Sequence, residues 1–91
     1  MLFIITHSSL SPVEINTLTA SSASDNLHAI IMTADGVYNQ QKLTELLPKA
    51  KLYALKNDMT LRGTTPVQGV TPITTEQLVA LSVTHYPWIT L

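Results

Sequence analysis

Three short runs of apolar residues constrain the fold of this 91-residue chain more than any other feature of its sequence. The runs are Leu2–Ile5, Leu27–Met32 and Leu52–Leu55. Near-continuous runs of this length are typical of strands that are covered on both faces. Longer stretches with wider apolar spacing separate them, as expected for helices. The alternation predicts an α/β fold, in which a mainly parallel sheet has helices on both faces.

The first helix is marked by a start signal. Ser11 is a good N-cap residue, and Glu14 three positions later completes a capping box. We expect the helix that follows to turn Val13 and Leu18 inward and to end in the polar stretch Ser21–Asn26.

Two further helices are predicted before residue 64. One covers Tyr38–Leu47, ends before Pro48, and turns three leucines to one face: Leu43, Leu46 and Leu47. The other is short, with Asn57 as its cap, Arg62 as its last residue and Gly63 as its C-terminal stop.

The last third of the chain contains one more helix start and the weakest strand signals. Thr74 and Gln77 form a second capping box. The segment Thr64–Pro72 is predicted to be a loop with at most a brief strand, and Pro72 suits an edge strand because it lacks an amide donor. Trp88–Leu91 is expected to form a final strand.

Size and composition narrow the classes of function. The length fits one domain spanning residues 1–91. Five basic and six acidic residues give a net charge of −1, so nothing favours direct nucleic-acid binding or an anionic membrane. Charged residues make up only 12% of the chain, about half the usual share of about 25%, which indicates a surface that faces a partner. The N-terminal apolar run is too short for a signal peptide or a membrane span, so we expect a cytoplasmic protein.

The chain contains no cysteine. This excludes disulfides, thiolate zinc sites, iron–sulfur clusters, a cysteine nucleophile and a persulfide carried on this chain. The three histidines, His7, His28 and His85, are far apart and lack the short spacing of metal ligands. Ser8 and Ser9 follow the first strand without a glycine-rich loop, and no nucleophile-elbow motif occurs. We therefore predict no catalytic residue, no metal and no cofactor.

Two weak polar features remain. Asp35-Gly36 follows the second predicted strand. One interpretation is a turn in which the glycine is available for a positive φ. The other places the carboxylate at the carboxyl edge of the sheet, where it could bind a partner or ligand. Asp58 and Arg62 are four residues apart and should meet on one face of the short helix.

The order of these features resembles the DsrH/TusB branch of the DsrE-like sulfur-relay family over roughly residues 1–91. The residues that carry the resemblance are Ala34–Tyr38, Lys51–Asp58, Arg62-Gly63, Ile73–Ser82, His85 and Trp88. The chain departs from the family pattern at Ala34, Leu61 and Thr74, and it has no cysteine in Thr17–Ser22, where some members carry one.

The resemblance implies a three-layer α/β/α sandwich around a five-stranded parallel sheet. It also implies a noncatalytic subunit of a sulfur-relay complex that supports 2-thiolation of the tRNA wobble uridine, bound to TusC-like and TusD-like homologous subunits. The alternative is a stand-alone domain that binds a small ligand or nucleotide at the strand ends near His7 and Asp35.

We also predict an apolar patch that binds partner chains, or a second copy when the chain is isolated. Its proposed residues are Asp35, Gly36, Val37, Tyr38, Asp58, Arg62, Tyr86 and Trp88. In this hypothesis Asp58 and Arg62 form a polar rim, and the aromatic side chains act as anchors. The competing interpretation is that these aromatic residues complete a small core.

Overall fold

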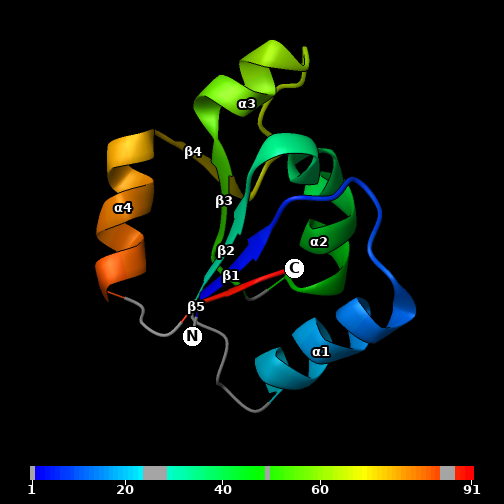
Figure 1. Cartoon of the computed structure of the whole chain (residues 1–91). Helices are drawn as coiled ribbons and strands as arrows, with labels where there is room; N and C mark the ends of the chain where they lie inside the picture. The colour runs from blue at the N-terminus through cyan, green and yellow to red at the C-terminus, as the bar shows by residue number, and fades with distance from the viewer. Residues whose placement is uncertain (1, 24–28, 49, 85–87) are drawn as a thin grey trace.

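In the part of the chain that the structure describes, five strands run parallel in one sheet (Figure 1). A computed structural model describes residues 2–23, 29–48, 50–84 and 88–91. The strands are β1 (Leu2–Ile5), β2 (Ala29–Met32), β3 (Leu52–Leu55), β4 (Val70–Ile73) and β5 (Trp88–Thr90). The helices are α1 (Pro12–Ala23), the 3₁₀ helix η1 (Ala34–Asn39), α2 (Gln40–Leu46), α3 (Lys56–Leu61) and α4 (Thr75–Thr84).

The strand order, β4-β3-β2-β1-β5, determines where the helices lie. The chain steps outward from β1 to β4 and then returns past β1 to add β5 at the other edge. Because crossovers between parallel strands are right-handed, a connection that reverses direction lies on the opposite face. Accordingly, α4 covers one side of the sheet, and α1 and α2 cover the other (Figure 1). The predicted parallel α/β architecture is confirmed.

The core is divided between the two faces of the sheet. Alternate residues of the strands point to opposite faces, and each face has its own buried cluster. The cluster beneath α1 and α2 includes Phe3, Ile5, Ile30, Met32, Leu18 and Leu43, and the cluster beneath α4 includes Leu2, Ala29, Ile31, Leu78 and Leu81. The strand runs in the sequence are continuous because both faces are covered.

Both capping boxes form as predicted. The Glu14 backbone N–H donates to Ser11 Oγ at 3.2 Å, and the Ser11 N–H donates to Glu14 Oε1 at 2.8 Å. At the start of α4, the Gln77 N–H donates to Thr74 Oγ1 at 3.3 Å, and the Thr74 N–H donates to Gln77 Oε1 at 2.8 Å. These reciprocal bonds satisfy backbone donors that a helix start leaves without partners.

The end of α3 also forms as predicted. Gly63 has a φ of 67°, its N–H donates to the Thr60 carbonyl at 3.2 Å, and the Thr64 N–H donates to the Met59 carbonyl at 3.0 Å. This pair of bonds is the Schellman motif that glycine favours. The predicted N-cap, Asn57, is wrong: α3 begins at Lys56 directly after β3, and no side chain caps it.

Two inward-facing side chains were predicted wrongly. Val13 is 73% exposed, because α1 packs through Ile15 and Leu18, and Val13 lies on a different side of the helix. Leu46 is also exposed, whereas Leu43 and Leu47 are buried as expected. The predicted helix over Tyr38–Leu47 is divided between η1 and α2.

The weak strand signals were interpreted correctly. β4 is an edge strand that contains Pro72, and β5 is the edge strand on the other side. No helix in the described part of the chain is long and apolar enough to cross a membrane.

Candidate functional site

Three charged side chains meet at the carboxyl edge of the sheet, where η1 follows β2 and α3 follows β3. Arg62 Nε donates to Asp35 Oδ1 at 2.9 Å. Arg62 Nη1 lies 3.9 Å from Asp58 Oδ1 and 3.4 Å from the Asp58 carbonyl oxygen. The predicted meeting of Asp58 and Arg62 is thus confirmed, but the closer partner of Arg62 is Asp35. The hydrogen bond that Arg62 donates to Asp35 is the main reason that the Arg62 pKa is raised above its ordinary value.

Asp58 has a structural role that its sequence position did not reveal. Its Oδ2 accepts a hydrogen bond of 2.8 Å from the Ala34 backbone N–H. Ala34 has a φ of 50°, which is uncommon for a residue with a Cβ. The Asp58 carboxylate therefore holds the turn that leads from β2 into η1. Asp58 is half-buried, whereas Asp35 is exposed.

Gly36 is required for a reason other than the predicted positive φ. Among the described residues, its φ is not one of those in the positive region. Instead, a Cβ on Gly36 would lie 2.0 Å from the Ile5 carbonyl oxygen and 2.6 Å from the Ile5 carbonyl carbon. Glycine is needed because η1 passes directly over the end of β1. The positive φ falls two residues earlier, at Ala34.

Two buried amide side chains complete this edge, and the sequence analysis missed both. Asn39 Nδ2 donates to the His7 carbonyl at 2.6 Å and to the Gly36 carbonyl at 3.3 Å, which joins the loop after β1 to η1. Gln40 Nε2 donates to the Thr65 carbonyl at 3.3 Å. The signal was present in the spacing, since both amides precede Leu43 by three or four residues and share its buried side.

Gln40 also connects a second loop to this edge. Its Oε1 accepts a hydrogen bond of 3.0 Å from the Val67 backbone N–H, while its Nε2 holds the Thr65 carbonyl. Both polar atoms of the Gln40 amide therefore fix the segment between α3 and β4 to α2.

The predicted partner patch is not one continuous surface. Asp35 and Tyr38 are exposed at the carboxyl edge, beside the half-buried pair of Asp58 and Arg62. Trp88, also exposed, pairs with Leu2 at the first residues of β5 and β1, so it lies at the amino edge. In an all-parallel sheet these two edges lie at opposite ends of the strands. The residues of the predicted patch are therefore divided between two separate surfaces.

Two of the other predicted patch residues are buried. Val37 is only 1% exposed and packs in the core cluster with Ile5 and Leu43, so its assignment to an exposed patch is wrong. Gly36, within η1, is buried against the end of β1. Tyr86 lies outside the described residues. Whether Asp35, Tyr38, Asp58, Arg62 and Trp88 contact a partner stays a prediction.

The histidine and serine positions form no recognisable metal or nucleophile site among the described residues. His7, Ser8 and Ser9 are exposed in the loop after β1, while His28 and His85 lie outside the described residues. Within the described ranges, no group of three or more metal-ligating side chains comes together. The polar groups of the carboxyl edge instead bind one another and the backbone.

Comparison with known families gives the class of this protein. The family model described as "DsrH like protein" matches residues 10–87, which is most of the chain. The chain therefore belongs to the DsrH family, as the sequence resemblance implied. It is a subunit of the sulfur-relay type, and proteins of this family generally work together with partner subunits. Among curated proteins, no sequence matches the chain significantly.

Proposed function

We propose that this protein is a noncatalytic subunit of a cytoplasmic sulfur-relay complex that supports 2-thiolation of the tRNA wobble uridine. Its partners would be two homologous small α/β chains, one TusC-like and one TusD-like. The observation that carries the noncatalytic role is that a member of a sulfur-relay family has no cysteine in 91 residues.

The chemistry of sulfur transfer explains why that absence matters. A persulfide forms on a thiolate sulfur, and the sulfur atoms of this chain belong to Met1, Met32 and Met59. A methionine sulfur is a thioether that already has two carbon substituents, so it cannot accept a transferable sulfur atom as a thiolate does. Met32 and Met59 are also buried in the core. The transferred sulfur would therefore be held by a partner chain.

The carboxyl edge supports the same proposal. The Asp35 carboxylate is bound to Arg62, and the Asp58 carboxylate is bound to a backbone amide. These side chains position η1 and α3 relative to each other, which presents the exposed Asp35 and Tyr38 at a fixed place. A fixed surface suits a subunit that organises a complex.

Affinity purification from the native cell tests the assembly. We expect gentle isolation of the tagged chain to recover two homologous small α/β chains in comparable amounts. A control purification with an unrelated tagged protein of similar size defines the background. Recovery of this chain alone under the same gentle conditions would contradict the proposed complex.

A labelling experiment separates the noncatalytic role from the assembly. The complex is incubated with a cysteine desulfurase and ³⁵S-labelled cysteine and then resolved on a nonreducing gel. We expect reductant-sensitive label on a partner chain and none on this chain. Label on this chain would overturn the noncatalytic assignment without affecting the assembly.

Deletion of the gene tests the proposed product. Loss of an organising subunit should lower the 2-thiouridine content of digested tRNA, measured by mass spectrometry, and the wild-type chain should restore it. Unchanged 2-thiouridine would exclude the role in tRNA while leaving a different sulfur acceptor open. Calorimetric titration with nucleotides and sulfur metabolites tests the alternative, since an organising subunit should give no saturable heat.

A further inference from the structure

The face of the sheet that carries α4 is only partly covered. Five strands about 4.8 Å apart give a sheet roughly 19 Å wide, and a packed helix is about 10 Å across. Each face therefore has room for two helices. Among the described residues, one face has both α1 and α2, whereas α4 is the only helix on the opposite face (Figure 1). The uncovered part lies over β3 and β4.

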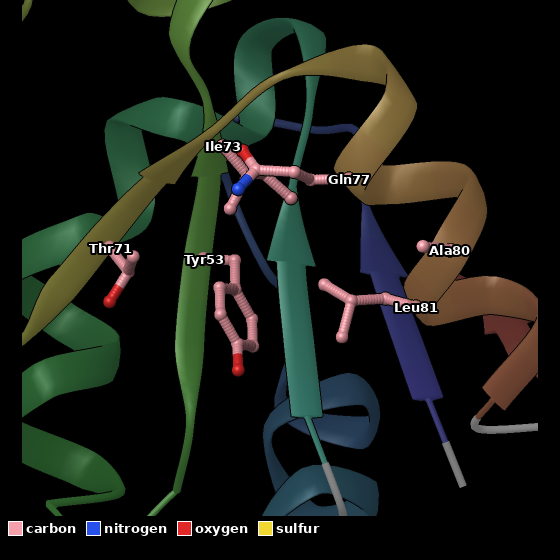
Figure 2. A pocket seen from close by; sticks show the side chains of 6 residues that line it. All are labelled: Tyr53, Thr71, Ile73, Gln77, Ala80 and Leu81. Atoms are coloured by element: carbon pink, nitrogen blue, oxygen red, sulfur yellow. The ribbon is translucent and has the colours of Figure 1, made fainter.

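A groove occupies the place where a second helix would lie. It encloses about 300 Å³ between α4 and the outer strands, and its lining residues are Tyr53, Thr71, Ile73, Gln77, Ala80 and Leu81. Figure 2 shows the Tyr53 ring on β3 between Thr71 of β4 and the helix α4, with Leu81 pointing toward the ring from α4. No charged side chain lines the groove.

The solvent side of α4 is itself apolar. Val79 is 57% exposed and Val83 is 76% exposed, one helical turn apart. Ala80 is exposed beside the groove. In residues 63–91, which contribute β4, α4 and β5, Glu76 is the only aspartate, glutamate, lysine or arginine. The outer side of α4 is therefore an exposed surface with apolar side chains.

We propose that the groove binds α4 of a second copy of this chain, so that the isolated protein forms a two-fold homodimer. Each copy supplies one protruding helix and one vacant groove, which is the self-complementary pairing that a two-fold interface requires. The two α4 helices lie side by side and parallel between the two sheets, with the two-fold axis running along them. Val79 and Val83 of each copy pack over Tyr53 of the other, and the two Ala80 residues face each other across the axis.

The expected size of this interface sets its strength. A ten-residue helix is about 15 Å long, and burying half of its surface together with the matching groove removes roughly 500 Å² per helix. Two exchanged helices bury about 1,000 Å² in total, the lower end of specific interfaces. An interface of this size lies at the boundary of weak, transient contacts, so the dimer should be a weak one. Uncharged surfaces allow this contact, since only the two Glu76 carboxylates approach each other, at the same end of the paired helices.

Sedimentation equilibrium of the isolated chain tests the proposal with three variants. Val83→Lys places a positive charge in the groove of the other copy and should weaken dimerisation at least about tenfold. Val13→Lys is the matched control, because Val13 is 73% exposed on α1, on the other side of the sheet, and this change should leave the dimer intact. Glu76→Gln removes the only like-charge contact and should strengthen the dimer, as should added salt. Both lysine positions are exposed, and circular dichroism confirms that each variant is folded.

A second measurement reports the geometry directly. The chain has no cysteine, so Ala80→Cys introduces a single thiol. In the proposed dimer the two sulfur atoms can meet, and mild oxidation should give a covalent dimer much faster than the same change at Val13. Equal cross-linking at both positions would overturn the proposal. A wild-type chain that stays monomeric at about 100 μM, or equal effects of the two lysine variants, would also overturn it. None of these results depends on the proposed role in sulfur relay.

Discussion

Of the three glycines in this protein, Gly36 should be the one whose replacement with alanine is most destabilising. The added Cβ would stand 2.0 Å from the Ile5 carbonyl oxygen. Ordinary contacts between carbon and a carbonyl oxygen begin at about 3.3 Å, so the overlap exceeds about 1 Å. The atom in the way is backbone in a buried central strand. It cannot rotate aside, so η1 or β1 must move.

The expected cost follows from what that movement disturbs. The same Ile5 carbonyl accepts the Thr33 N–H at 2.9 Å, a bond that a shift of η1 would stretch. Overpacking in a core costs about 1–3 kcal/mol, and a weakened buried hydrogen bond adds about 1 kcal/mol. The free energy of unfolding should therefore fall by about 2–4 kcal/mol. With a urea m-value of about 1.5 kcal/mol per M, the midpoint should fall by roughly 2 M.

Gly63→Ala is the matched control for this measurement. Gly63 has a φ of 67°, but nothing lies within 4 Å of the place where its Cβ would be. That substitution carries only the backbone cost of a left-handed residue, about 1–2 kcal/mol, reduced by the stiffer unfolded chain. Urea unfolding followed by circular dichroism should rank Gly36→Ala clearly below Gly63→Ala. Equal midpoints for the two variants would refute the argument that close approach, and not backbone conformation, requires glycine at position 36.

Two further predictions concern polar contacts. Asp58→Ala should lower the free energy of unfolding by about 1–2 kcal/mol, because the Ala34 N–H loses its charged acceptor. Asp35→Ala removes only an exposed ion pair and should lower it less. A larger loss of stability for Asp35→Ala in urea unfolding would contradict this ranking. The Glu14 pKa is lowered from its ordinary value of 4.5, first by the Ser11 backbone N–H and then by the Ser11 hydroxyl, so Ser11→Ala should raise that pKa part of the way back in an NMR titration. Because the folded pKa lies below the unfolded one, the stabilisation from Glu14 is present above the unfolded pKa and is lost as the pH falls through the folded pKa.

The strands and the starts of α1 and α4 could be predicted from the sequence because their signals are local. A continuous apolar run such as Leu52–Leu55 reports burial on both faces, and the residues that form a capping box are only three positions apart. Short-range chemistry of this kind does not depend on the rest of the fold. The same holds for Gly63, whose role at the end of α3 is set by its immediate neighbours.

The errors at Gly36 and Asp58 concern contacts between segments that are distant in the chain, whereas the error at Val13 is local. Gly36 meets Ile5 across 31 positions of sequence, and no local pattern distinguishes that close approach from a turn glycine. Asp58 holds Ala34, 24 positions away, through a single carboxylate oxygen. Val13 was assigned to the core because it is apolar, although the spacing of Ile15 and Leu18 defines the buried side of α1.

The placement of polar and apolar groups separates two tasks within this small chain. At the carboxyl edge, where α/β proteins commonly bind ligands, Asp58, Asn39 and Gln40 are used to fix loops to one another. Side chains committed to backbone partners are poorly suited to binding a reactant. On the α4 face, by contrast, Tyr53, Ala80 and Val83 are apolar or uncharged and lie at or near a groove. Binding energy from such a face comes from contact area, which fits the proposed dimer, and we expect substitutions there to alter assembly while leaving the fold intact.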